Sequence, residues 1–165
     1  MSEYCVVVAD GNRARFFILN RAEQPGLEPG PTLAEEGEAL VNAEAEAGGG
    51  ALFGDSKKTG RGYSSSRGVH GYDDNREDHM DEFKRRFAKQ IAERAVQMAA
   101  RKRSKTLVLA AEKRMLGFLR DALEVPAKAT FTVRELAKDV SRLEPHELHS
   151  HLAGEGLIPA RRRPS

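Results

Sequence analysis

The residues best suited to binding chemistry lie in one glycine-rich stretch, residues 57–72, which reads KKTGRGYSSSRGVHGY. Cationic side chains can neutralise phosphates, tyrosine rings can stack on exposed bases, and glycine lets two backbones approach closely. The side chains of these kinds are Lys57, Lys58, Arg61, Tyr63, Arg67 and Tyr72. They predict an RNA-binding loop, while the same composition also suits a connecting loop that only has to stay in solution.

Two motifs come close to known cofactor or metal sites and fail on one residue each. A P-loop starting at Gly54 would need glycine at position 59, where the chain has Thr59. The segment HELHSH at 146–151 has Ser150 where a zinc-protease helix needs its second histidine. His146 and His149 alone supply two ligands without a third. We therefore predict no cofactor, no metal and a surface helix over 146–151.

Three carboxylates lie near the predicted ends of strands, where nucleases of the ribonuclease-H type collect acidic groups around two metal ions. They are Asp10, Glu112 and Asp139. A tight turn already accounts for Asp10. The prediction is a protein without enzymatic activity, with a metal-dependent nuclease as an alternative.

The single cysteine, Cys5, excludes an intramolecular disulfide and lies inside an apolar run, so we expect it to be buried. The first residues, MSEYCVVVAD, lack the charged and apolar regions of a secretory signal. Both features predict a cytoplasmic protein. The longest apolar runs, 4–9 and 107–111, are too short to cross a bilayer, so no membrane partner is expected.

The charge of the chain is unevenly distributed, although its net value is only +2. Residues 22–46 contain seven glutamates and no lysine or arginine, which leaves 27 basic against 18 acidic side chains elsewhere. Such asymmetry suits a polyanionic partner, and it also suits the solvated surface of a mildly basic protein.

The segment YCVVVADGNRARFFILN predicts a β-hairpin with strands at about 4–9 and 14–19. The residues between them, Asp10, Gly11 and Asn12, are expected to supply the positive φ angles of a tight hairpin turn. Because the first run is continuously apolar, its strand should be covered on both faces and central in the sheet.

The remaining pattern predicts one domain over residues 1–165 with alternating strands and helices. A short edge strand after Pro31 and a long flexible loop at about 48–72 precede a helix over 76–102. The helix prediction rests on an apolar stripe at intervals of three and four. Its members are Met80, Phe83, Phe87, Ile91, Ala95 and Met98.

A second continuous apolar strand is expected at 106–111, followed by a helix whose apolar positions include Met115 and Leu119. Residues 130–139 fit either an alternating strand or a helix capped by Thr132 and Glu135. A short helix follows Pro145, and residues 160–165 form a basic tail.

The stretches VVVADGNRARFF, LVLAAEKRMLGFLRDAL and ELAKDVSRLEPHELHSHL resemble the bacterial host-attachment protein family. That family is similar to the middle domain of eukaryotic and archaeal peptide-chain release factors and of Pelota. With the intervening helix, the similar stretches cover nearly the whole chain. The resemblance implies an α/β, ribonuclease-H-like mixed β-sheet of about five strands with an N-terminal hairpin, a long amphipathic helix and two shorter helices. It also makes residues 130–139 a strand.

In the release factors, the loop before the long helix carries the Gly-Gly-Gln tripeptide required for peptide release. Here that loop reads TGRGYSSSRG, and the run at 48–50 continues into Ala51, so release activity should be absent. The resemblance implies a module associated with RNA or the ribosome in translation, with ribosomal RNA or tRNA as partner. Its contact surface would combine the loop with the basic end of the long helix. The family's label gives the alternative, a factor for attachment to host cells or a regulator of attachment.

Overall fold

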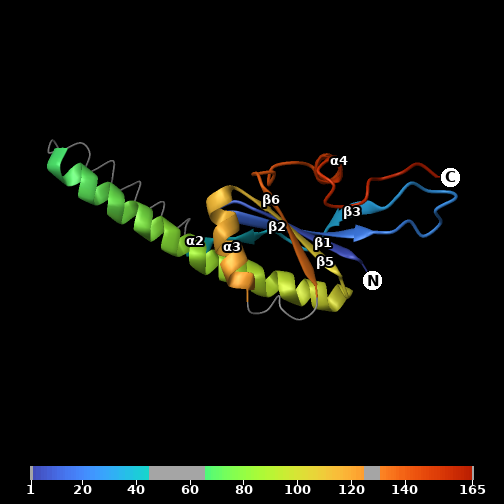
Figure 1. The fold of residues 1–165 in the computed structure, drawn as a ribbon, viewed down its shortest axis with the longest axis horizontal. Coiled ribbons are helices and arrows are strands. Elements are labelled where there is room, and N and C mark those ends of the chain that lie inside the picture. The colour runs from blue at the N-terminus through green and yellow to red at the C-terminus, as the bar shows by residue number, and fades with distance from the viewer. Residues whose placement is uncertain (1, 45–65, 125–130, 165) are drawn as a thin grey trace.

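The computed structural model describes residues 2–44, 66–124 and 131–164, with the backbone alone described over 66–78. The strands are β1 (Tyr4–Ala9), β2 (Arg13–Asn20), β3 (Thr32–Glu35), β4 (Leu40–Val41), β5 (Thr106–Ala111) and β6 (Thr132–Ala137). The helices are α2 (Ser66–Lys102), α3 (Lys113–Leu123) and α4 (Pro145–Gly154). They form a mixed sheet with helices on both of its faces (Figure 1).

The strand order is β3-β2-β1-β5-β6, and β4 pairs with β2 beside this path. β1 pairs antiparallel with β2 and parallel with β5, while β6 is parallel to β5 at one edge and β3 antiparallel to β2 at the other. The predicted α/β class, opening hairpin and edge strand after Pro31 are confirmed. The sheet has six strands rather than about five, because the short β4 joins it, and it is compatible with a ribonuclease-H-like fold.

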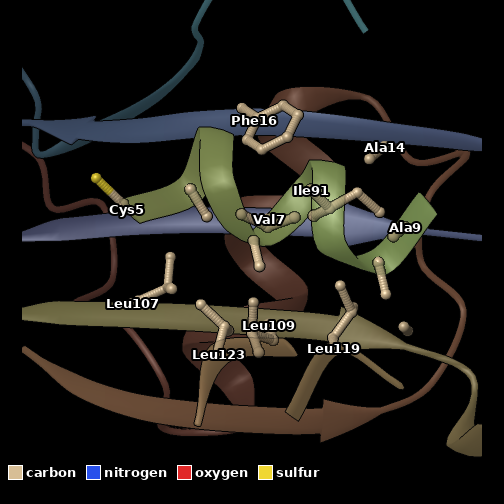
Figure 2. Packing of buried hydrophobic residues seen from close by; sticks show 14 of the residues in the cluster. Cys5, Val7, Ala9, Ala14, Phe16, Ile91, Leu107, Leu109, Leu119 and Leu123 are labelled. Atoms are coloured by element: carbon tan, nitrogen blue, oxygen red, sulfur yellow. The ribbon is translucent and has the colours of Figure 1, made fainter. Parts of the chain in front are cut away.

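The central strand β1 is buried on both faces, as its unbroken apolar run predicts. Its residues Cys5, Val7 and Ala9 face the core formed with α2 and α3, and Figure 2 shows Val7 and Ala9 near Ile91 of α2. The alternate residues Val6 and Val8 face a second core that includes leucines of α4. Fully burying an apolar side chain of this size stabilises the fold by about 1.5–3 kcal/mol relative to leaving it exposed. Helices are therefore needed on both faces of the sheet.

The hairpin turn forms where predicted, but by a different mechanism. Within the described residues, the positive φ angles of glycines occur only at Gly37 and Gly156, so the expected left-handed conformation at Gly11 and Asn12 is wrong. Instead, the Asp10 carboxylate accepts hydrogen bonds from the backbone N–H groups of Asn12 (2.7 Å) and Arg13 (2.8 Å). An aspartate that bonds its own turn supplies a local closure that needs no positive φ.

The long helix begins ten residues earlier than predicted, at Ser66, so residues 66–72 are helical and not part of a loop. Two glycines in this segment each disfavour helix by about 1 kcal/mol, yet extending an existing helix adds one hydrogen bond per residue. Phe87, Ile91, Ala95 and Met98 of the predicted stripe are buried, whereas residues 80 and 83 are half-buried. Beyond them the helix projects past the sheet (Figure 1). None of the described helices is long and apolar enough to cross a membrane.

The ambiguous segment at 130–139 contains strand β6, so the capped-helix alternative is wrong. β6 pairs with β5 from Thr132 to Ala137, and the Thr132 N–H donates to the Lys105 carbonyl at 2.8 Å. The pairing partner lies more than twenty residues away in sequence. A local sequence pattern could not show that this segment pairs with the edge of β5 that β1 leaves free.

Candidate functional site

Of the predicted RNA-binding loop, the structure describes only the backbone from residue 66 onward, which lies far from the basic end of α2. Lys57, Lys58, Arg61 and Tyr63 lie outside the described residues, and the backbone of Arg67 and Tyr72 lies in the first turns of α2. Arg67 and Arg101 are at opposite ends of this single helix, about 50 Å apart at 1.5 Å per residue. A partner would have to be extended to reach both ends.

The projecting arm, which we define as residues 66–79 of α2, starts from a fixed base at the carboxyl edge of the parallel strands. The buried Asn42 side chain donates from Nδ2 to the backbone oxygens of Gly11 (3.1 Å) and Phe83 (3.5 Å). Arg114 at the start of α3 forms an ion pair with Asp81 of α2. These contacts join the hairpin turn, α3 and α2 at one point, so the arm extends from a supported helix.

The basic end of α2 is partly neutralised by the protein's own acidic segment. Glu36 lies 3.6 Å from Arg101 and 3.5 Å from Lys102. Arg103 and Lys105, just beyond, are exposed and form no ion pair with any described residue. The charge separation seen in the sequence is therefore reduced in three dimensions, and two cations remain available at this end.

The three carboxylates considered for a nuclease do lie at the ends of the parallel strands β1, β5 and β6. Glu112 caps α3 by accepting from the N–H groups of Arg114 (3.0 Å) and Met115 (2.7 Å). Asp10 closes the hairpin turn, and the Ser141 hydroxyl lies 2.6 Å from Asp139 and 3.3 Å from Asp10. The part of the chain that the structure describes contains no group of three side chains suited to holding a metal ion. The local bonds of these carboxylates support turns and a helix start.

The helix α4 was predicted to lie at the surface, but one of its histidines is buried. His146 is exposed, but His149 is buried with 4% exposure, and its Nε2 lies 2.8 Å from the Pro159 carbonyl oxygen. A carbonyl can only accept, so Nε2 donates the hydrogen. No sequence signal pointed to this contact, because Pro159 lies ten residues away, beyond the end of α4.

Cys5 is buried, as predicted, and is hydrogen-bonded rather than reactive. The Ser104 hydroxyl donates to the Ser2 carbonyl at 2.6 Å, so the Cys5 thiol donates to the Ser104 oxygen, 2.9 Å away. Burial raises the pKa of the Cys5 thiol, against a smaller opposite effect of the Ser104 hydrogen bond. The thiol therefore stays protonated at neutral pH.

This raised pKa predicts a loss of stability in alkaline solution. The unfolded thiol releases its proton at about pH 8.5, before the folded one, so the unfolded state then binds fewer protons and the free energy of unfolding falls as pH rises further. Denaturant titrations of wild type and Cys5→Ala between pH 7 and pH 10 should show a constant difference below about pH 8. Above it, the wild type should lose stability relative to the variant, and parallel curves throughout would contradict the assignment.

Comparison with protein families identifies a family for this chain. A family model described as "Protein required for attachment to host cells" matches residues 5–152, from β1 into α4. A comparison with curated proteins gave no match. Among the described elements, the matched region contains β1 from its second residue, the other five strands, the helices α2 and α3, and most of α4. The chain therefore belongs to the family of proteins required for attachment to host cells.

Proposed function

We propose that this protein contributes to attachment to host cells as a non-enzymatic binding protein. The observation that carries the proposal is the family match over residues 5–152, which spans the sheet and nearly all of its helices. The chemistry of the described residues supports a binding role, because the carboxylates at the sheet edge are bonded to turns, a serine and a helix start.

The contact surface in this proposal is the projecting arm together with the cationic segment that precedes it. Fourteen residues of helix extend about 20 Å, enough for a partner to contact the arm without touching the sheet. The arm and residues 57–65 carry the four predicted cations, Lys57, Lys58, Arg61 and Arg67. Their charge suits a partner with an acidic or phosphorylated surface.

The experiment is deletion of the gene in the organism that encodes it, followed by counting cells attached to the host surface. Attachment should fall on deletion and return with the wild-type gene. It should not return fully with a variant in which Lys57, Lys58, Arg61 and Arg67 are alanine. Unchanged attachment after deletion would overturn the proposal.

A matched control separates the cationic segment from net charge. Four exposed cations, Lys89, Lys138, Arg142 and Arg163, form no ion pair within 4.0 Å with any described residue. Replacing these four with alanine removes the same charge from other surfaces. This control variant should restore attachment, and a failure of both variants would assign the effect to total charge.

A second candidate, association with RNA or the ribosome, is favoured by the exposed cations Arg103 and Lys105 at the far end of α2. The resemblance of the sequence motifs to a family similar to release-factor middle domains implies the same role, and the glycine-rich cationic segment before the arm suits it. An effect on the translation of attachment factors would make this role compatible with the family's description. Ribosomes sedimented from lysate should carry the protein at low salt and release it at high salt. A protein that stays in the soluble fraction at both salt concentrations would rule the candidate out.

A further inference from the structure

A groove of about 780 Å³ lies on the sheet face opposite α2, between α4, the start of β3 and the segment that follows α4. This volume falls within the range of small-molecule sites. The polar side chains among its lining residues are Thr32, His146, His149, Ser150 and Arg161. No acidic residue lines it, although the chain contains 25 acidic residues. The polar side chains that line the groove are therefore basic or neutral.

Both walls of the groove are held by contacts outside it. On the α4 wall, Leu148 and Leu152 are fully buried in the second core. On the other wall, Ile158 is buried, and Arg162 exchanges two backbone hydrogen bonds with Gly30, at 2.9 and 3.1 Å. A cavity between two anchored elements keeps its shape before a ligand arrives, which lowers the entropic cost of binding.

His149 places a fixed acceptor in this groove. Its Nε2 hydrogen is donated to the Pro159 carbonyl, so the Nδ1 atom of the neutral ring carries the lone pair. Nδ1 has no hydrogen-bond partner among the described residues, and it is not among their atoms sealed from solvent. Because His149 is only 4% exposed and lines the groove, Nδ1 would be reached from the groove in the site proposed below. A ligand hydroxyl can donate to it.

Arg161 supplies the complementary charge. It is exposed, lines the groove and forms no ion pair within the part of the chain that the structure describes. Thr32 and Ser150 add hydroxyl groups, and Leu33 and Ala153 add apolar surface for a carbon skeleton. An arginine without a carboxylate partner favours a carboxylate or phosphate group.

We propose that this groove binds a small hydroxylated organic anion, such as a sugar acid or a sugar phosphate. Arg161 holds the anionic group, Nδ1 of His149 accepts a hydrogen bond from a ligand hydroxyl, and the hydroxyls of Thr32 and Ser150 complete the polar contacts. The inference goes beyond the proposed function and does not depend on it, since the groove and the projecting arm belong to different parts of the fold.

Calorimetric titration of the full chain with glucuronate, glucose 6-phosphate and glucose tests the class of ligand. We expect binding of at least one of the two anions. Glucose should bind at least tenfold more weakly, because it has no anionic group for the charge-assisted hydrogen bond with Arg161. The two anions distinguish a carboxylate from a phosphate ligand. Absence of binding by both anions, or equal binding of glucose, would overturn the proposal.

Variants then locate the site. Arg161→Ala should weaken binding of the anion about tenfold, whereas Arg163→Ala, a matched exposed arginine outside the lining, should leave it unchanged. Ser150→Leu, at an exposed lining position, should block the groove without disturbing buried His149. Equal effects of Arg161→Ala and Arg163→Ala, or undiminished binding by Ser150→Leu, would place any binding elsewhere and refute the groove as its site.

Discussion

For the RNA-binding candidate, replacing Lys57, Lys58, Arg61 and Arg67 together with alanine is expected to lower affinity for single-stranded RNA by two to three orders of magnitude at about 0.1 M salt. Each phosphate that a cation neutralises releases counterions, which adds about 0.7 to the slope of log affinity against log salt. Four lost contacts should reduce that slope by about 3. Fluorescence anisotropy of a labelled RNA, measured at several salt concentrations, gives both quantities.

The matched control for this experiment is the variant with alanine at Lys89, Lys138, Arg142 and Arg163, which removes equal charge. It should retain most of the affinity, and neither variant should shift the thermal unfolding temperature. Equal losses in the two variants would mean that RNA responds to net charge alone. A lower unfolding temperature in the first variant would instead show that the segment has a structural role.

Phe87→Ala is expected to lower the free energy of unfolding by about 3–5 kcal/mol, which is a large part of the total stability of a domain this size. Phe87 is fully buried where α2 packs on the sheet, so truncation both loses apolar burial and leaves a cavity. Denaturant titration followed by circular dichroism measures the change. The unfolding temperature should fall by roughly 10 °C.

Two other positions on the same helix test whether the loss of stability depends on the burial of the substituted side chain. Gln90→Ala changes an exposed side chain and should stay within about 0.5 kcal/mol of wild type. Met80→Ala should cost less than Phe87→Ala, because Met80 is only half-buried at the point where the helix leaves the sheet. If all three variants lost similar stability, the division of α2 into a packed half and a projecting arm would be wrong.

The candidate site could be predicted only in part, because its chemistry depends on which charges meet. The sequence showed an acidic segment and a basic remainder, and it could not show that Glu36 lies against Arg101 and Lys102. It also could not show that His149 contacts Pro159 and lines a groove. These contacts join elements whose separation in the chain carries no periodic signal.

The sequence by itself determined the elements whose apolar pattern is strong and local. β1 and β5 are continuous apolar runs, and they occupy the predicted residues because only a strand covered on both faces needs such a run. α3 could also be predicted, because its apolar residues recur at intervals of three and four and so lie on one face of a helix. For residues 132–137 the local pattern left strand and helix open, the family resemblance predicted a strand, and the structure confirms it. The tertiary structure alone decided that α2 starts at Ser66 and that Asp10 closes its turn without positive φ. Each of these outcomes depends on backbone or side-chain hydrogen bonds, which the apolar pattern of a sequence does not encode.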